Sequence, residues 1–177
     1  LVHAHATGWD VVVPIFENEN LDGAVSWTGF LNGYASWTHG GSDVELSYAP
    51  SFNSSYRRSF LIGLESGLAS AMSAGDDMMR RLRAAGKRAR LEPAARMGHA
   101  NTSSLSHWLR QRFVAGRVIA GTRGRSWSLP RRAAYALGAP LIPIVLLARN
   151  RRGIARTMRR NRVTPAVLPL LGAGAFV

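Results

Sequence analysis

The chain has 177 residues, no cysteine and a formal net charge of +13. This length suffices for one domain with a buried core, and a hydrophobic content of 46% is typical of a globular or membrane-associated protein rather than a disordered one. Without cysteine the chain has neither disulfides nor thiolate metal sites, which fits a reducing compartment.

The charge is divided very unevenly along the chain. Residues 1–79 carry nine acids and only two bases, Arg57 and Arg58, for a net charge of −7. Residues 80–177 carry 21 bases and one acid, Glu92, for a net charge of +20. This asymmetry predicts a polyanionic partner for the second half: a membrane surface, a nucleic acid or a phosphorylated substrate.

The first half of the sequence predicts alternating strands and helices. Residues 11–15 are apolar and predict a buried strand with Pro14 near its end. Apolar and aromatic residues recur at helical spacing over residues 24–37, which predicts a helix. Residues 44–48 alternate and predict a short strand, and residues 56–64 predict a short helix.

The middle of the chain predicts a helix, two strands and a longer helix. The first helix runs from Asp76 to about Ala85, carries an apolar stripe and ends at Gly86. Two strands are predicted over residues 88–91 and 95–99. Residues 103–119 then predict a helix with one apolar side.

The last fifty residues have the composition of a membrane-associating tail. Residues 133–148 are uncharged, residues 149–162 contain seven arginines, and residues 163–177 are again uncharged. Each apolar run is shorter than the roughly 20 residues that a spanning helix needs. The first run can therefore be interfacial or re-entrant, and the last can be the beginning of a span. The arginines between them would then lie on the cytoplasmic side.

Asp76 and Asp77 stand together at the start of the helix predicted from residue 76. A carboxylate beside a sugar acceptor can take the hydroxyl proton as that oxygen attacks. Asp is also favoured at helix N-caps, where it interacts with the positive end of the helix dipole. The spacing alone leaves both interpretations open, a catalytic base and a helix cap.

Five other residues are candidates for binding. His99, at the end of a predicted strand, can ligate a divalent metal or a phosphate oxygen, or be structural. Asn53, Arg57 and Arg58 lie where a loop meets a helix and can hold sugar hydroxyls or phosphate, or form a solvated turn. Arg112 lies on a helix that interleaves arginine with aromatic residues, a pattern that suits nucleic acid or a membrane surface.

The order of these motifs is more specific than any one of them. A strand with a proline is followed by Asn-x-x-x-Arg-Arg, and then by an acidic pair that opens a helix ending Arg-Leu-Arg-Ala-Ala-Gly. Pro93, His99 and an aromatic-Arg helix come next. Over roughly residues 8–128 this order resembles the later half of the family 2 glycosyltransferases. It is most similar to the bacterial, membrane-associated members that build surface polysaccharide or glycolipid.

The resemblance implies an α/β fold, an incomplete GT-A (Rossmann-like) glycosyltransferase domain followed by an apolar, Arg-rich membrane-associating helical tail. We expect residues 1–128 to be the C-terminal part of the catalytic domain and residues 129–177 to be the tail. The family's N-terminal nucleotide-binding part, with its Asp-x-Asp metal motif, is missing from the sequence. We therefore expect the chain to be a fragment that is inactive alone.

The resemblance also implies residue roles. Asn53, Arg57 and Arg58 would shape the acceptor and substrate side of the site, and Arg112 with its aromatic neighbour would close over the donor. His99 would lie close to the metal, a divalent Mg²⁺ or Mn²⁺ implied by the resemblance. Asp76 and Asp77 match the acidic pair that carries the catalytic base.

The acidic pair departs from the family pattern. The family's pair is Glu-Asp and falls two places earlier relative to the following arginines, so that Asp77, Asp76 or Glu65 can supply the base. Leu109 and Phe113 replace the glutamine and tryptophan of processive members, which predicts a non-processive enzyme.

The function implied is inverting transfer of a sugar from a nucleotide-diphosphate donor to a hydroxyl acceptor. The partners would be a nucleotide-sugar, a saccharide or lipid-linked acceptor and an anionic membrane surface. The location would be the cytoplasmic face of a bacterial cell membrane. Two alternatives stay open: a non-enzymatic basic module that binds anionic lipid or nucleic acid, and a degenerate transferase. Nucleic acid is the less favoured ligand, because the apolar runs beside the arginines suit lipid better.

Overall fold

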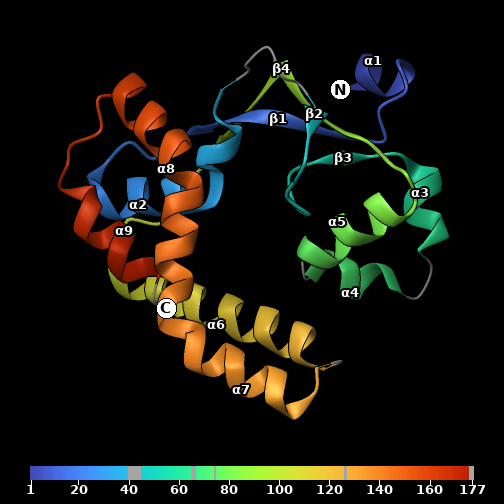
Figure 1. Ribbon diagram of the computed structural model, residues 1–177. Helices are drawn as coiled ribbons and strands as arrows, with labels where there is room; N and C mark the ends of the chain where they lie inside the picture. Colours follow the sequence, from blue (N-terminus) through green and yellow to red (C-terminus); the bar gives the residue numbers. More distant parts are fainter. Residues whose placement is uncertain (40–44, 65–66, 74, 126, 176–177) are drawn as a thin grey trace. The chain divides into compact units, whose positions relative to one another are not determined.

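The computed structural model describes residues 1–39, 45–64, 67–73, 75–125 and 127–175, and it has a mixed α/β architecture (Figure 1). The expected α/β class is confirmed at this level. The elements are α1 (Val2–Ala6), β1 (Val11–Asn18), α2 (Gly23–Tyr34), the 3₁₀ helix η1 (Ala35–Trp37), β2 (Glu45–Leu46), β3 (Ser55–Tyr56), α3 (Arg58–Gly63), α4 (Leu68–Ser73), α5 (Gly75–Ala84), β4 (Ala89–His99), α6 (Leu105–Gly124), α7 (Leu129–Gly138), the 3₁₀ helix η3 (Ala139–Leu141), α8 (Ile142–Arg160) and α9 (Val167–Ala175).

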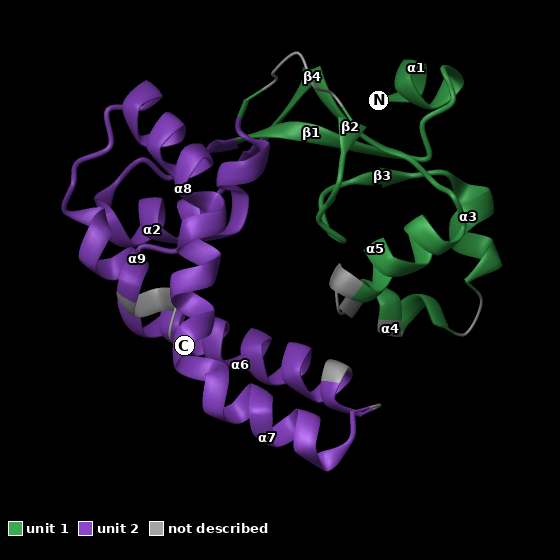
Figure 2. Ribbon diagram, in the orientation of Figure 1, with its two compact units in different colours: residues 1–16, 39–97 green, residues 17–38, 98–177 purple. Residues whose placement is uncertain are grey.

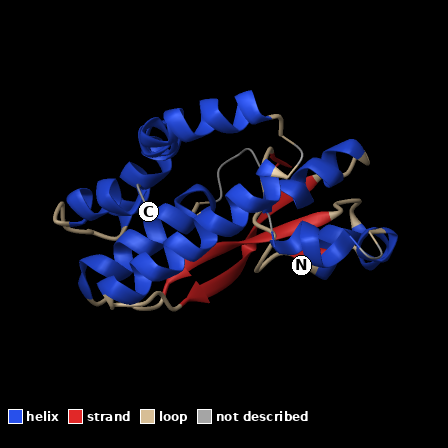
Figure 3. Ribbon diagram, turned by 90° about the horizontal axis from the view of Figure 1, so that it is seen from below, coloured by secondary structure: helices blue, strands red, loops and turns tan. Residues whose placement is uncertain are grey.

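The described strands, red in Figure 3, form one mixed sheet. Their order in this sheet is β2-β4-β1-β3. The outer strands are short and antiparallel to their neighbours, with Val11 opposite Tyr56 and Glu45 opposite Arg90. The two long strands, β1 and β4, therefore lie at the centre and give the sheet most of its length.

β1 and β4 run parallel. The Val11 N–H donates to the Arg88 carbonyl at one end, and the Glu19 N–H donates to the His99 carbonyl at the other. Between these bonds β1 advances by 8 residues (19 − 11) and β4 by 11 (99 − 88). β4 therefore contains three additional residues, which is the signature of bulged backbone.

A central strand tolerates Pro14 because of the alternation of its backbone. Val11 donates toward β4, so the nitrogens of residues 12 and 14 face the opposite side, toward β3. The pairing with β3 covers only Val11 and Val12. The N–H that Pro14 lacks would thus have no ladder partner, and proline costs the sheet no hydrogen bond there.

The core of the sheet is built on β1. Val11, Val12 and Val13 are fully buried, as expected of a strand in a parallel pair that is covered on both faces. Met78 and Leu82 of α5 are also buried, one turn apart on the same face of their helix. The short apolar run in the sequence and the apolar stripe of the helix are therefore both core elements.

Two expected elements differ from the observed ones. β4 is a single strand through Pro93, not two strands, because the exposed proline lies in backbone that carries extra residues. Ser55 and Tyr56 pair with β1 rather than beginning a helix, and α3 starts at Arg58. In both places pairing with β1 overrides the local pattern, which is the usual context dependence of strand propensity.

The chain divides into two compact units (Figure 2). Unit 1 comprises residues 1–16 and 39–97, and unit 2 comprises residues 17–38 and 98–177. The expected boundary between residues 128 and 129 lies inside unit 2, between α6 and α7, and stays a prediction.

The described part of α9 belongs to the core of unit 2. α9 packs against α2 and α8, and Val167 and Leu171 are buried. An apolar run that begins a membrane span would instead present its side chains to lipid. Val167 and Leu171 are thus core residues, whereas Leu168 between them is 52% exposed.

The second half of α8 is also part of unit 2. Thr157 is fully buried, and its hydroxyl lies 2.7 Å from that of Thr38, which follows η1. Gly153 lies so close to η1 that a Cβ there would be 2.8 Å from the Ala35 carbonyl oxygen. Glycine is therefore required at position 153 for α8 to approach η1 this closely.

We predict that Gly153→Ala lowers the free energy of unfolding by about 1–3 kcal/mol, because the added methyl group overpacks against backbone that cannot rotate away. Gly121→Ala is the matched control, since a Cβ at Gly121 in α6 meets nothing within 4 Å. The control should be neutral or stabilising by up to about 1 kcal/mol through helix propensity. Chemical denaturation of both variants measures the difference, and equal stabilities would contradict the prediction.

Candidate functional site

The acidic pair lies in the first turn of α5, which begins at Gly75. Asp77 is buried, with 7% of its surface exposed. The side chains of Asp76 and Glu65 lie outside the described residues. Asp77 is consequently the member of the predicted catalytic group whose surroundings can be described.

Both carboxylate oxygens of Asp77 are engaged by arginines of its own helix. The Arg81 Nε donates to Oδ2 at 2.8 Å, and Arg80 donates to Oδ1. These are (i, i+4) and (i, i+3) pairs at the positive end of the helix dipole, so they stabilise the start of α5. Asp77 therefore has a structural role at the start of α5 through these ion pairs rather than as an N-cap, since the helix begins two residues earlier at Gly75.

The same geometry does not remove Asp77 from consideration as a base. Each carboxylate oxygen carries two lone pairs, and one arginine bond uses only one of them. Asp77 is thus a fixed, buried carboxylate with acceptor capacity remaining.

Asn53, Arg57 and Arg58 lie on consecutive short segments of unit 1. Asn53 is exposed and adopts a left-handed φ of 55°, a conformation that Asn tolerates better than most residues. Arg58 is the exposed first residue of α3. These two side chains are therefore available to a ligand.

Arg57 is used inside the fold. Its guanidinium donates to the carbonyls of His5 and Trp9, and its Nε lies 3.8 Å from Asp10. These contacts fix the N-terminal segment onto the sheet and use two of the five N–H donors of the guanidinium. The predicted binding role of Arg57 has to compete with these contacts.

Tyr56 is a half-buried residue that the sequence did not single out. Its hydroxyl donates to the Pro50 carbonyl at 2.9 Å. Burial, with repulsion from Tyr48, raises the pKa of Tyr56 to about 12. The only sequence signal was a tyrosine inside the Asn-x-x-x-Arg-Arg segment, which does not indicate burial.

His99 and Arg112 lie in unit 2, apart in sequence from the acidic pair of unit 1. The His99 ring packs on Tyr34 with centroids 4.4 Å apart, and its buried Nδ1 has no hydrogen-bond partner within the described residues. Burial lowers the pKa of His99, so the neutral ring is favoured.

The described residues contain no group of three or more His, Asp or Glu that could hold a metal ion. His99 thus belongs to no such group of three in the part of the chain that the structure covers. Mg²⁺ and Mn²⁺ prefer oxygen ligands, which a lone imidazole does not supply. The surroundings of His99 do not fit the implied metal.

Arg112 and Phe113 are adjacent on α6 but differ in exposure. Arg112 is half-buried, and burial lowers its pKa, whereas Phe113 is 54% exposed. Neighbouring helical residues point about 100° apart, so the two side chains face different surroundings. Arg112 and Phe113 therefore do not present to a ligand the one shared surface that the resemblance implies.

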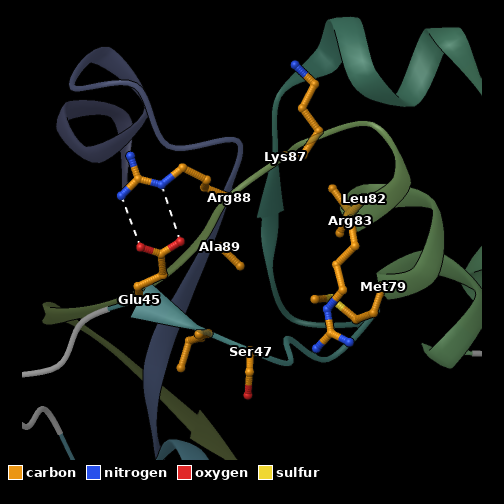
Figure 4. Close-up of a pocket in the computed structure, with 9 residues that line it drawn as sticks. Glu45, Ser47, Met79, Leu82, Arg83, Lys87, Arg88 and Ala89 are labelled. Carbon is orange, nitrogen blue, oxygen red and sulfur yellow. Dashed lines mark hydrogen bonds and ion pairs between the residues drawn. The ribbon is translucent and has the colours of Figure 1, made fainter.

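A pocket of about 420 Å³ opens in unit 1 between α5, the turn after it and β2 (Figure 4). Its lining residues are Glu45, Leu46, Ser47, Met79, Leu82, Arg83, Lys87, Arg88 and Ala89. The pocket uses the face of α5 that carries Met79 and Arg83, and Asp77 is not part of its lining.

The cations of this pocket are mostly neutralised within the fold. Arg88 forms a two-bonded fork with Glu45, at 3.3 and 3.1 Å, and Lys87 lies 3.3 Å from Asp10. In Figure 4 the Lys87 side chain points away from the other labelled residues, and Arg83 extends beside Met79. These ion pairs leave little net positive charge for an anionic ligand.

The structure therefore does not gather the sequence-predicted residues around one described cavity. Asp77, Asn53, Arg57 and Arg58 belong to unit 1, whereas His99 and Arg112 belong to unit 2. A single site that combines all of them stays a prediction.

Comparisons with models of known families, with curated proteins and with solved structures find no match for this chain. Within the described residues, the helical segment Leu129–Arg160 is long and apolar enough, by length and composition, to cross a membrane. Only 6% of its most apolar window is buried inside the fold.

We predict that Tyr56→Phe changes stability mainly at alkaline pH. The folded pKa is raised above the unfolded value of 10.0, so the wild type keeps the full contribution of Tyr56 below pH 10 and loses it as pH rises toward 12. The Phe variant loses the bond to Pro50, about 1 kcal/mol, near neutral pH, but its stability should fall less between pH 10 and 12. Urea denaturation at several pH values measures both effects, and parallel profiles would contradict the prediction.

We also predict an order of stabilities for the Asp77 cluster. Asp77→Asn should cost about 1–2 kcal/mol, because two charge-assisted hydrogen bonds of a buried group are weakened. Arg81→Gln should cost less, and Arg80→Gln least, since the Arg80 side chain is 77% exposed and that of Arg81 is 41% exposed. Thermal unfolding of the three variants tests this order. A larger loss of stability in Arg80→Gln than in Asp77→Asn would contradict it.

Proposed function

We propose that this chain forms the acceptor-side part of an inverting glycosyltransferase of the GT-A type, attached to the cytoplasmic face of a bacterial membrane. Its reaction is transfer of a sugar from a nucleotide-diphosphate donor to a hydroxyl of a saccharide or lipid-linked acceptor. The product belongs to a surface polysaccharide or glycolipid.

One observation carries most of this proposal. The acidic pair opens α5, and α5 leads through a tight glycine turn directly into β4, the strand that pairs in parallel with β1 and ends at His99. The acidic pair, the glycine and His99 thus follow one another on α5, the turn after it and β4, the strand that pairs with β1. Asp77 is held by Arg81 at the beginning of this segment of α5, turn and β4.

The chemistry requires little of the protein at the acceptor. The acceptor oxygen attacks the anomeric carbon, the bond to the nucleoside diphosphate breaks, and a carboxylate takes the hydroxyl proton. Asp77 or Asp76 supplies that carboxylate. The exposed side chains of Asn53 and Arg58 are available to hydrogen-bond acceptor hydroxyls.

The metal and the arginine that face the donor diphosphate remain expectations of the resemblance. The surroundings of His99 do not form a metal site among the described residues, so no step is assigned to a metal here.

A specific observation also favours a second function, that of a degenerate transferase acting as a membrane-bound binding module. Each oxygen of Asp77 accepts from an arginine of its own helix, and the side chain is only 9% exposed, which restricts the approach of an acceptor. After Glu92 the sequence contains no acid at all, so the second half is purely cationic and suits an anionic surface.

The test uses the protein expressed from its complete gene. UDP-, GDP- and dTDP-sugars are supplied as donors with a lipid extract as acceptor, and release of nucleoside diphosphate is measured. We predict that Asp77→Asn or Asp76→Asn lowers kcat about 10²–10⁴-fold, the contribution expected of a general base. Asp22→Asn is the control, because Asp22 is exposed and makes no side-chain capping bond.

Wild-type rates in both aspartate variants would overturn the assignment of the base. No release from any donor by the wild type, together with intact membrane binding, would favour the binding module. Salt-sensitive binding to DNA without vesicle binding would favour a nucleic-acid module instead.

A further inference from the structure

The most unusual surface of the described structure lies in unit 2, at α7, η3 and the first turns of α8. Leu129 is 77% exposed, Leu137 is 84% exposed and Leu141 is 61% exposed. The run continues with four exposed β-branched or leucine side chains, Ile142, Ile144, Val145 and Leu146. An apolar patch of this extent marks an interaction surface on a soluble domain.

The apolar segment is bent rather than straight. η3 interrupts the helix between Gly138 and Ile142, with Pro140 inside it and Pro143 in the first turn of α8. Figure 1 shows α7 and α8, both orange, running in different directions on either side of this point. Prolines that follow one another at this spacing remove backbone donors and break a continuous helix.

The uncharged part of the segment is also short. It covers residues 133–148, which is 16 residues (148 − 133 + 1). Even a straight helix of that length would extend only about 24 Å, less than the roughly 30 Å of a bilayer's hydrocarbon core. With a bend at η3 its reach is smaller still.

Arginines flank the segment on both sides. Arg131 and Arg132 precede it, and Arg149, Arg151 and Arg152 follow it, all exposed. Residues 98–177 contain fourteen arginines and no Asp or Glu. A span would carry one flank across the membrane, whereas both flanks are attracted to the same anionic leaflet.

The first flank has the composition of a membrane interface. The rings of Trp127 and Tyr135 pack together with centroids 4.2 Å apart, and the Arg131 guanidinium lies 4.7 Å from the Trp127 ring. Trp, Tyr and Arg gather where hydrocarbon meets headgroups, because each combines an apolar body with a polar tip.

The chain on both sides of the apolar segment is packed into unit 2. At the near end, Trp108 of α6 is buried against α2, where a Cβ on Gly29 would lie 3.2 Å from its Nε1. At the far end, Ile154 and Thr157 of α8 are buried in the core of unit 2. The arginines of α6 make it unsuitable as a span, so the chain between these anchors returns to the side from which it left.

We infer that residues 133–148 insert into one leaflet of an anionic lipid bilayer as a re-entrant wedge, and that the arginines on both flanks bind headgroups of that same leaflet. The occupant of this surface is lipid because apolar side chains at the bend lie between two cationic flanks, the arrangement of a monolayer-inserting segment. Insertion of this kind deepens the proposed membrane location. It needs no sugar donor, so its failure is distinguishable from failure of the transferase proposal.

The first test measures binding of the full chain to phosphatidylcholine vesicles with and without phosphatidylglycerol. We predict tighter binding to the anionic vesicles. Leu137→Asp should weaken it about tenfold, because a carboxylate is placed where the wedge enters hydrocarbon. Arg151→Gln with Arg152→Gln should also weaken it about tenfold, because two headgroup contacts are lost.

Two controls match these variants. Leu21→Asp changes a leucine that is 63% exposed and lies outside the wedge. Arg58→Gln with Arg83→Gln removes the same charge from unit 1. Both controls should bind as the wild type does. Equal binding of all variants, or binding that ignores phosphatidylglycerol, would overturn the inference.

The second test separates a wedge from a span and uses the absence of native cysteine. Single cysteines are introduced as Ser128→Cys before the wedge, Thr164→Cys after α8, and Leu137→Cys at the bend. A membrane-impermeant maleimide is then added outside vesicles that carry bound protein. Residues 128 and 164 should both be labelled, and residue 137 should be protected only when vesicles are present.

Protection of residue 128 or residue 164 alone would show that the segment crosses the bilayer, and it would overturn the wedge. Labelling of residue 137 at the same rate with and without vesicles would show that lipid is not the occupant. These measurements are made in the wild-type sequence apart from one cysteine, so they do not depend on the folding of the Leu137→Asp variant.

Discussion

The parallel pairing of β1 with β4 is the constraint on which the rest of the described structure depends. A parallel pair needs a long crossover, and here the crossover holds everything from α2 to α5. It also needs cover on both faces, which explains why Val11, Val12 and Val13 are all buried. Asp76 and Asp77 lie on α5, the last helix of that crossover. Their position is therefore set by the parallel pairing of β1 with β4.

Charge is handled differently in the two halves of the sequence. In unit 1 the buried acids recruit cations: Asp10 accepts from the Arg88 N–H and pairs with Lys87 and Arg57, and Asp77 pairs with arginines of its own helix. These interactions join the turn after α5 to the start of β1 and compensate for burying carboxylates. The arginines beyond residue 98 find no acid in their own segment, so their charge is left for a partner outside the fold.

The sequence predicted the elements whose pattern is local. The aromatic spacing of α2, the apolar stripe of α5 and the strand at Val11 were found because burial repeats at helical or strand period there. β4 was predicted as two strands on either side of Pro93, whereas the observed strand is continuous and its bulged backbone accommodates the proline. The contact of Thr38 with Thr157 had no local signal, because 119 positions separate the two residues and arginines surround the second.

α8 joins two environments within one helix, and this gives the tail its character. Its second half requires Gly153 to approach η1 and buries Ile154, whereas its first turns expose Ile144 and Val145. A helix is stiff over this distance, so whatever covers the first turns fixes the orientation of the half that is packed in unit 2. If lipid covers them, the arginines at positions 149, 152 and 156, which recur every three or four residues on one face, face the headgroups. Anionic headgroups would then neutralise the arginines of a segment that contains no acid of its own.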